Sequence, residues 1–285
     1  MTGEWDSWIG RTEVRTDRAS EALCRRWLAT LDLAAPDGDA MPQGIHLCLC
    51  TPDAATAMLG EDGHPARDDT PGSFFPPIPL PRRMWAATEI AFQAPIRRGA
   101  RIERISRIVS VAQKTGSTGL LGFVDVEHVT TADGAEAVLE RQTLVYRGAS
   151  ASDAPLSPPP PGRGEFARDE WDSVETIVPS EALLFRFSAL TFNTHRIHYD
   201  APYARDVERY RGLVVHGPLI ASLLLQLVAA RLGDNRLASF NFRAVSPAIA
   251  GEALHLALRE TSDGLELGSF ASDGRQTLTA SAVLS

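Results

Sequence analysis

The most regular hydrophobic pattern in the chain runs from 217 to 232, where nearly every position is apolar. A helix formed by this run has no wide polar face, so the pattern predicts a helix that is buried on all sides. Pro218 falls in the first turn and Gly233 follows the last apolar residue, as is typical of helix ends. At about 1.5 Å per residue the helix spans roughly 24 Å, which is short for a membrane crossing.

Eight other segments mix β-branched, aromatic and alternating polar residues, as strands do. Turn signals such as Asp133-Gly134 and Asp263-Gly264 separate several of them, and the short connections favour antiparallel pairing. Two more apolar segments, 171–178 and 182–188, lead into a polar cluster, and the one directly before the cluster is interpreted as strand-like. The eight predicted strands cover 84–92, 100–113, 120–131, 137–147, 239–245, 253–260, 264–270 and 277–284.

The N-terminal third is less regular. Apolar residues at three- and four-residue spacing predict an amphipathic helix over 18–33. The segment 35–72 is rich in Asp, Gly and Pro and is expected to be a loop with one short strand at 45–50. The prolines of 74–83 remove backbone donors, so this segment is expected to be extended and outside any central strand.

A weak internal repeat suggests two copies of one unit. In the first copy, Phe92-x-Ala94 is followed by Pro95 and, four residues after this proline, by Gly99. In the second copy, Phe242-x-Ala244 is followed by Pro247 and, four residues after this proline, by Gly251. Each copy is expected to be a curved sheet around a helix, with 18–33 as the only candidate helix in the first copy. The Ser-, Ala- and Pro-rich stretch 149–164 has linker composition, which places the predicted domains at 1–148 and 165–285.

Composition excludes several classes of protein. The net charge of −8 offers no basic stripe for nucleic acid. The first ten residues have no apolar signal core, and three cysteines make no disulfide framework, so a cytoplasmic location with reduced thiols is expected.

The residues after 186 resemble a known family. The string 187–200, Phe-Ser-Ala-Leu-Thr-Phe-Asn-Thr-His-Arg-Ile-His-Tyr-Asp, with His216-Gly217 at the start of the buried helix, is similar to the MaoC-like, (R)-specific enoyl-CoA hydratases and dehydratases. The N-terminal half resembles their degenerate dehydratase domain. This resemblance implies an α+β double hot-dog fold and places the chain near the itaconyl-CoA and mesaconyl-C4-CoA hydratase group. Where the broader family has an Asp five residues before its His, this chain has Asn193.

Hydration of an unsaturated thioester requires a base, a proton donor and a stabiliser for the developing enolate oxygen. We expect His198 to be the acid or base, because imidazole titrates near neutral pH. Asn193 can hold the water through its amide. The backbone N–H of Gly217, at the positive end of the buried helix, can bind the enolate oxygen.

Other polar residues of the cluster have two interpretations each. His195, Tyr199 and His216 are candidate substrate-binding residues, although His195 can simply line the site and His216 can be a structural residue at the helix entry. Arg196 pairs either with Asp200 or with a substrate carboxylate. The set His195-x-x-His198-x-Asp200 lacks the spacing of a helical metal site, so no metal is expected.

The predicted function is an acyl-CoA hydratase that converts itaconyl-CoA or mesaconyl-C4-CoA to citramalyl-CoA, a substrate implied by the resemblance. The alternatives are a 3-hydroxyacyl thioester dehydratase for CoA or carrier-protein substrates, a non-catalytic acyl-thioester-binding protein, and a thioesterase. No cofactor is expected beyond the CoA of the substrate. An acyl-CoA thioester is the expected partner, with no nucleic acid or membrane and with a possible homodimer.

Overall fold

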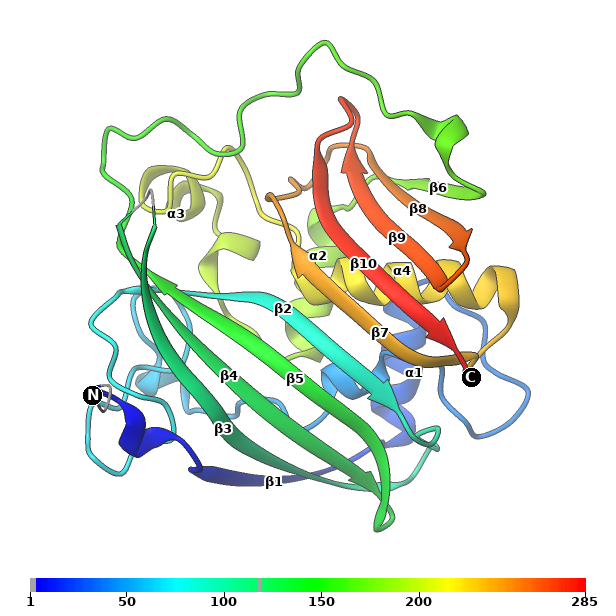
Figure 1. The fold of residues 1–285 in the computed structure, drawn as a ribbon, viewed down its shortest axis with the longest axis horizontal. Helices are drawn as coiled ribbons and strands as arrows, with labels where there is room; N and C mark the ends of the chain where they lie inside the picture. The colour runs from blue at the N-terminus through cyan, green and yellow to red at the C-terminus, as the bar shows by residue number, and fades with distance from the viewer. Residues whose placement is uncertain (1–3, 117–118) are drawn as a thin grey trace.

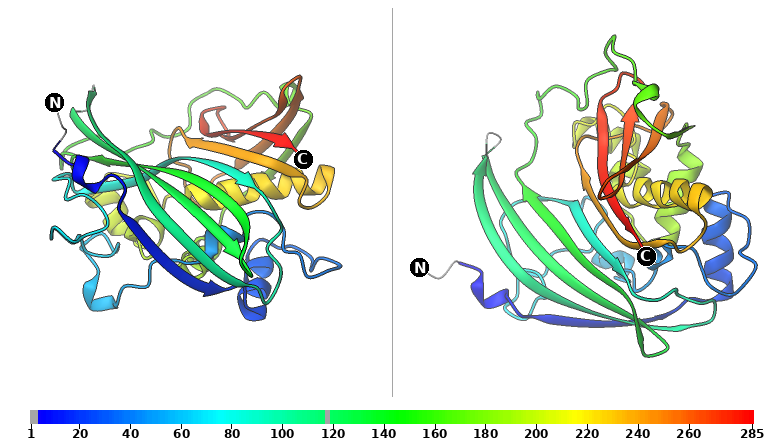
Figure 2. Two further views of the ribbon diagram at one scale, coloured as in Figure 1. Left: turned by 60° about the horizontal axis from the view of Figure 1, so that its bottom comes forward. Right: turned by 45° about the vertical axis from the view of Figure 1, so that its right-hand side comes forward.

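A computed structural model describes residues 4–116 and 119–285, and within them ten strands form one antiparallel sheet (Figure 1). The eight strands predicted over 84–147 and 239–284 are all present, and Figure 2 shows that the sheet curves strongly toward the helices. The strands are β1 (Thr12–Arg18), β2 (Arg82–Phe92), β3 (Arg101–Gly116), β4 (Gly119–Ala132), β5 (Ala135–Arg147), β6 (Ser173–Ile177), β7 (Leu237–Ala244), β8 (Leu254–Thr261), β9 (Gly264–Ala271) and β10 (Gln276–Leu284).

The strand order confirms the internal repeat. Along the sheet it is β1-β3-β4-β5-β2 and then β7-β10-β9-β8-β6, so each half places its first, third, fourth, fifth and second strand side by side. The halves join where β2 pairs with β7, from Ala87 opposite Arg243 to Ala91 opposite Ser239. The two glycines of the sequence echo, Gly99 and Gly251, both adopt positive φ, 84° and 82°, in matching turns after β2 and β7.

Two further helices also repeat. Helices α1 (Glu21–Thr30) and α2 (Glu181–Leu190) follow the first strand of each half, and both begin with Ser-Glu-Ala-Leu. The hydroxyls of Ser20 and Ser180 accept hydrogen bonds from the third amide of each helix, which satisfies a free donor at the helix start. The strand-like interpretation of 182–188 was therefore wrong, because this serine cap starts a helix whose Leu184 and Phe187 are buried on one side.

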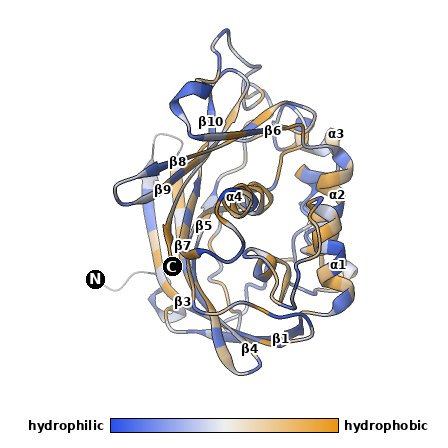
Figure 3. Cartoon of the chain, turned by 90° about the vertical axis from the view of Figure 1, so that its right-hand side faces the viewer, coloured by the Kyte–Doolittle hydropathy of each residue, from blue (hydrophilic) through white to orange (hydrophobic). Residues whose placement is uncertain are grey.

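Helix α4 (Gly217–Leu232) is the predicted buried helix. Figure 3 looks along it and shows it between the sheet on one side and α1 and α2 on the other. Leu219 and Leu224 are fully buried in a core that includes Phe240 and Leu267 of the sheet. Among the described residues, no helix combines the length and the apolar character needed to cross a membrane.

Among the described residues of the first half, no helix corresponds to α4. Helix α1 matches α2 in position and sequence, so the expectation that 18–33 is the central helix of the first copy was wrong. Between α1 and β2 the chain forms only the short 3-10 turns η2 (Ile45–Cys48) and η3 (Thr56–Met58). A strand had been expected at 45–50, but Gly44 has φ 108°, and a Cβ at this position would lie 3.2 Å from Leu225 on α4, so the chain turns here.

The remaining described segments connect these elements. Residues 149–167 form no helix and no strand, apart from one isolated bridge at Ser157, which agrees with a linker composition. The predicted domain bounds, 1–148 and 165–285, stay a prediction. Of the proline-rich segment 74–83, residues 74–81 form no strand, as expected, but Arg82 and Arg83 already belong to β2, so the expectation was wrong for these two residues. The short elements are η1 (Asp6–Trp8), η4 (Arg168–Glu170), η5 (Arg196–His198) and α3 (Ala201–Asp206).

Candidate active site

A cavity of about 690 Å³ lies between the two halves. The second half contributes the loop after α2 and the start of α4. The first half contributes part of its long loop and the inner face of β2 to β5, the face that no helix covers. The cavity therefore extends into the space beneath the sheet that α4 occupies in the second half.

His198 is a neutral imidazole in the cavity wall. It is 7% exposed, and its Nδ1 lies 2.7 Å from the carbonyl oxygen of Val214. A carbonyl can only accept, so Nδ1 carries the proton and Nε2 is left with a free lone pair. Burial, followed by the nearby His195 imidazole, lowers the pKa of His198 to about 3. Near neutral pH, His198 can therefore take a proton through Nε2.

The start of α4 lies directly beside this imidazole. The ring of His216 stacks on that of His198 with centroids 3.6 Å apart, and Ser188 Oγ lies 2.8 Å from His216 Nε2. This agrees with a structural role for His216 at the helix entry. The next residue, Gly217, lines the cavity, and its N–H donates to no acceptor among the described residues. A Cβ at Gly217 would meet no atom within 4 Å, so there is open space beside this amide at the positive end of the helix.

Asn193 also lines the cavity, but one part of its amide is already used. Its Oδ1 accepts a hydrogen bond of 2.9 Å from the backbone N–H of His195, which fixes the turn of the loop. The side-chain NH2 group of Asn193 is left to contact a water or substrate.

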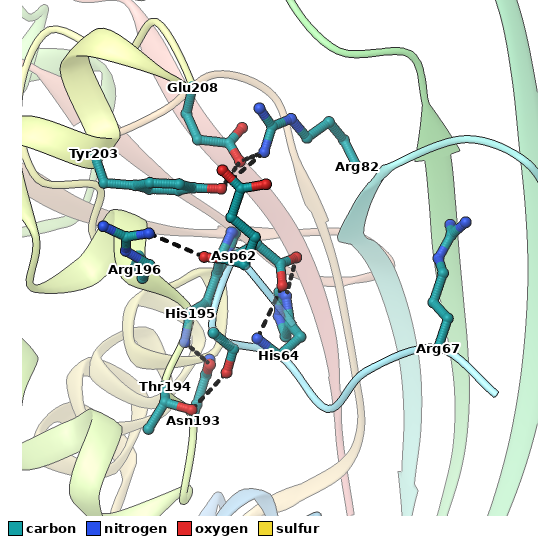
Figure 4. A network of polar contacts seen from close by, with 12 residues as sticks. Asp62, His64, Arg67, Arg82, Asn193, Thr194, His195, Arg196, Tyr203 and Glu208 are labelled. Carbon is teal, nitrogen blue, oxygen red and sulfur yellow. Dashed lines mark hydrogen bonds and ion pairs between the residues drawn. The ribbon is translucent and has the colours of Figure 1, made fainter. Parts of the chain in front are cut away.

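The sequence analysis missed an Asp–His pair in this cavity. Asp62 and His64 come from the long loop of the first half, and both line the cavity (Figure 4). Asp62 Oδ2 lies 2.9 Å from His64 Nδ1, and the His64 ring is 4.1 Å from that of His195, which is 5.5 Å from that of His198. Burial lowers the pKa of His64, against the effect of Asp62. For Asp62, burial opposes ionisation, but the hydrogen bond from His64 holds its pKa below the usual value.

The loop that carries this pair is hydrogen-bonded to the segment 191–200, which follows α2. The hydroxyl of Thr194 donates to the carbonyl of Gly63 at 2.5 Å, and the N–H of Arg196 donates to the carbonyl of Asp62 at 2.9 Å. Gly63 has φ 86°, and a Cβ there would lie 1.9 Å from the carbonyl oxygen of Thr194. Only glycine fits at this position, so the Asp62-Gly63-His64 motif was a sequence signal for this close approach. It was overlooked because the segment 35–72 is rich in Asp, Gly and Pro throughout.

The possible metal ligands differ from those considered in the sequence. Ligand atoms of Asp62, His64 and His195 all lie within 4.8 Å of one another, a spacing that could hold an ion. In the set considered earlier, Nδ1 of His198 is bound to a carbonyl, and Asp200 is occupied by other partners. The hydrogen bond between Asp62 and His64 accounts for their proximity without a metal.

Arg196 and Tyr199 lie outside the residues that line the cavity. Arg196 donates through Nε and Nη2 to Asp200 at 3.0 and 2.7 Å and stacks over Tyr203, so the first of its two predicted partners is the one observed. Asp200 also accepts from the Tyr203 N–H at 3.0 Å and caps α3, which is a structural role. Tyr199 is 48% exposed. We therefore do not assign substrate contacts to Arg196 or Tyr199.

Comparison with known proteins identifies the family. Residues 44–250 match the model of the hydroxyacyl-thioester dehydratase type 2 family. The chain is 40% identical over 287 residues, 99% of each chain, to a mesaconyl-C(4)-CoA hydratase of Chloroflexus aurantiacus. It is also 37% identical over 89 residues, 30% of this chain and 29% of the other, to the mitochondrial hydroxyacyl-thioester dehydratase type 2 of Schizosaccharomyces pombe.

Solved structures agree on the fold. A MaoC-like dehydratase aligns with a TM-score of 0.73 at 14% identity over 98% of both chains. A Mycobacterium tuberculosis protein described as having a double hotdog fold aligns with a TM-score of 0.56 at 16% identity, over 97% of this chain and 96% of that one. The α+β double hot-dog prediction is thus confirmed. We conclude that the chain belongs to the hydroxyacyl-thioester dehydratase type 2 family and is a hydro-lyase acting on acyl thioesters.

Proposed function

We propose that the protein reversibly adds water to an α,β-unsaturated acyl-CoA, with mesaconyl-C4-CoA as substrate and citramalyl-CoA as product. The observation that carries the reaction is that a neutral imidazole with a free Nε2, on His198, and an unoccupied helix-start amide, on Gly217, line the same cavity. The choice of substrate is supported by the name and the full-length similarity of the Chloroflexus relative. Itaconyl-CoA is the second substrate to test.

The reaction needs one proton to move from water to the α-carbon. Nε2 of His198 takes a proton from water as its oxygen bonds to the β-carbon, and the π electrons of the double bond move onto the thioester oxygen. The Gly217 N–H donates to that oxygen, and one such donor contributes about 3 kcal/mol in known enzymes. The imidazolium then gives its proton to the α-carbon, which restores the neutral base and completes hydration. Elimination of water follows the same steps in reverse.

The Asp62–His64 pair supports the neighbouring proton transfer. Since Asn193 cannot act as a base, the carboxylate of Asp62 is a candidate for the negative charge that stabilises an imidazolium in this site. It is hydrogen-bonded to His64, at one end of a row of rings that runs through His195 to His198. We assign His64 and Asp62 to positioning the water and stabilising the transient cation.

The proposed reaction needs no metal and no cofactor other than the CoA of the substrate. Both halves of one chain line the cavity, so a second chain is not required to complete it, and the homodimer stays a prediction. A cytoplasmic location, predicted from the sequence, also belongs to this proposal.

The test is a substrate panel of mesaconyl-C4-CoA, itaconyl-CoA and crotonyl-CoA. Hydration is followed as loss of enoyl-thioester absorbance and as gain of one water by mass. We expect turnover of mesaconyl-C4-CoA that His198→Gln removes. A His198→Gln rate equal to wild type would favour a non-catalytic thioester-binding protein, release of free CoA thiol would show a thioesterase, and turnover only of carrier-bound chains would favour the dehydratase alternative.

A further inference from the structure

A second polar cluster lies in the same cavity, in the first half. It consists of His46 on η2, Arg104 and Ser106 on β3, His128 on β4, and Glu140 on β5, and we call these five residues the distal cluster. Ser106, His128 and Glu140 are direct neighbours across three strands. The distal cluster faces the region of the first half that has no counterpart of α4, where an apolar lining would be expected if only a hydrocarbon chain entered.

The distal cluster contains unpaired polar atoms. His46 Nε2, Arg104 Nε and Glu140 Oε1 are three of the eight buried side-chain polar atoms without a hydrogen-bond partner in the part of the chain that the structure describes. His46 and Glu140 are 5% and 8% exposed. Buried polar atoms are nearly always hydrogen-bonded, so three unpaired ones in one wall of a cavity are available to bind a polar ligand.

The charge of the distal cluster favours an anion. The Arg104 guanidinium donates to the carbonyls of Leu49 and Cys50, and it forms no ion pair with any described residue. Burial raises the pKa of Glu140 to about 7, against the effect of Arg104, and burial lowers the pKa values of His46 and His128 to about 3. Arg104 is then the one full charge of the five residues over much of the pH range below 7.

We propose that Arg104 of the distal cluster binds the carboxylate at the far end of the acyl group, which makes Arg104 the residue that selects dicarboxylic over monocarboxylic CoA thioesters. A single guanidinium matches the single charge of a carboxylate, and its planar N–H groups fit the planar anion. A phosphate dianion would require more positive charge than this wall offers. The inference rests on the proposed function, and it transfers to Arg104 the carboxylate contact that the sequence suggested for Arg196.

The first experiment uses the unmodified protein and saturated inhibitors in pairs of equal chain length. The pairs are succinyl-CoA with butyryl-CoA, glutaryl-CoA with pentanoyl-CoA, and adipyl-CoA with hexanoyl-CoA. At the chain length that reaches the distal cluster, the dicarboxylic member should inhibit roughly 10- to 100-fold more strongly than its partner, because a hydrogen bond to a charged group is worth about 1.5–3 kcal/mol. Equal or weaker inhibition by the dicarboxylic member at every length would overturn the proposal.

The second experiment locates the contact. Arg104→Gln should reduce the preference for the dicarboxylic inhibitor by the same roughly 10- to 100-fold factor. The control is Arg107→Gln on the same strand, since Arg107 is an exposed residue paired with Glu127 outside the cavity lining, and it should leave the preference unchanged. An Arg104→Gln protein that folds and keeps the wild-type preference would refute the assignment; if this variant does not fold, the inhibitor pairs with wild-type protein decide.

The outcomes separate this inference from the proposed function. If the wild-type enzyme hydrates crotonyl-CoA and prefers monocarboxylic inhibitors, the hydratase reaction stands, but the carboxylate subsite and the choice of mesaconyl-C4-CoA as substrate are both wrong. If it hydrates no enoyl-CoA but still prefers the dicarboxylic inhibitors, the subsite is supported while the hydratase proposal fails.

Discussion

Gly63→Ala tests whether the long loop of the first half completes the active site. The new Cβ would lie 1.9 Å from the carbonyl oxygen of Thr194, whereas real Cβ atoms keep at least about 3.0 Å from such a neighbour. The loop and the catalytic segment must therefore separate by about 1 Å, and a displacement of that size can cost about 100-fold in rate. We expect kcat for enoyl-CoA hydration to fall by about this factor.

Two control variants separate collision from backbone strain. Gly99 has nearly the same φ, 84°, but a Cβ there meets no atom within 4 Å, so Gly99→Ala carries the cost of positive φ alone, about 1–2 kcal/mol of stability. Gly38→Ala in the same long loop has neither problem. Both variants should keep the wild-type kcat, and Gly99→Ala should show a lower Tm.

The measurements are kcat and KM from the absorbance assay and Tm from circular dichroism for all three variants. A folded Gly63→Ala protein with the wild-type kcat would refute the reasoning. It would mean that the close approach of Gly63 to Thr194, and with it the position of the Asp62–His64 pair, has no part in catalysis.

Other variants and conditions give independent predictions. His198→Gln should lower kcat by about 100- to 10,000-fold, the range for loss of a general base, with an unchanged circular dichroism spectrum; a smaller loss would remove His198 from the mechanism. His64→Gln should lower kcat more than it raises KM, because it perturbs a transient cation and not ground-state binding; a pure KM effect would contradict this. Burial lowers the pKa values of His46, His128 and His198 from the ordinary 6.5 to about 3, so the folded state binds fewer protons than the unfolded state between these values. The stability that they contribute is complete above pH 6.5 and is lost as the pH falls toward 3. Burial raises the pKa of Glu140 from 4.5 to about 7, so the stability that Glu140 contributes falls as the pH rises between these values. This effect opposes that of the histidines, but it comes from one group and theirs from three. Urea unfolding should therefore show lower stability at about pH 5.5 than at about pH 7.5, and a higher stability at the lower pH would contradict these burial effects. Dialysis against a chelator should leave the rate unchanged, since the carboxylate beside His64 is already hydrogen-bonded; loss of a stoichiometric metal together with activity would show instead that the pair is a metal site.

The elements with unambiguous periodicity could be predicted from sequence. The run 217–232 is apolar at nearly every position, and turn signals separate several of the eight predicted strands. The helix and eight of the ten described strands were therefore predicted within a few residues, whereas β1 and β6 were not among the predicted strands. The segment 182–188 is short and apolar and fits either a strand or a buried helix by pattern alone. The repeated Ser-Glu-Ala-Leu at 20–23 and 180–183 would have resolved it, because α1 was already recognised as a helix.

The candidate site residues divide in the same way. His198, Asn193 and Gly217 occur close together in sequence and near a recognisable motif, so they could be predicted, and all three line the cavity. His64 lies 131 residues before His195 in a loop without periodicity, and only the folded chain brings their rings within 4.1 Å. The pairing of Arg196 with Asp200 at i and i+4 was visible in the sequence, as was the alternation that places Arg104 and Ser106 on one face of β3.

The absence of a second central helix has a consequence for stoichiometry. A pair of identical units related by a twofold axis would contain two equivalent reaction centres, each lined partly by residues of the other unit. In the part of the chain that the structure describes, the central helix with the Gly217 amide occurs in the second half alone. The first half contributes the rest of the cavity and the distal cluster. One polypeptide thus holds one molecule of substrate, in one orientation, and active-site titration should find a single equivalent of tightly bound acyl-CoA per chain.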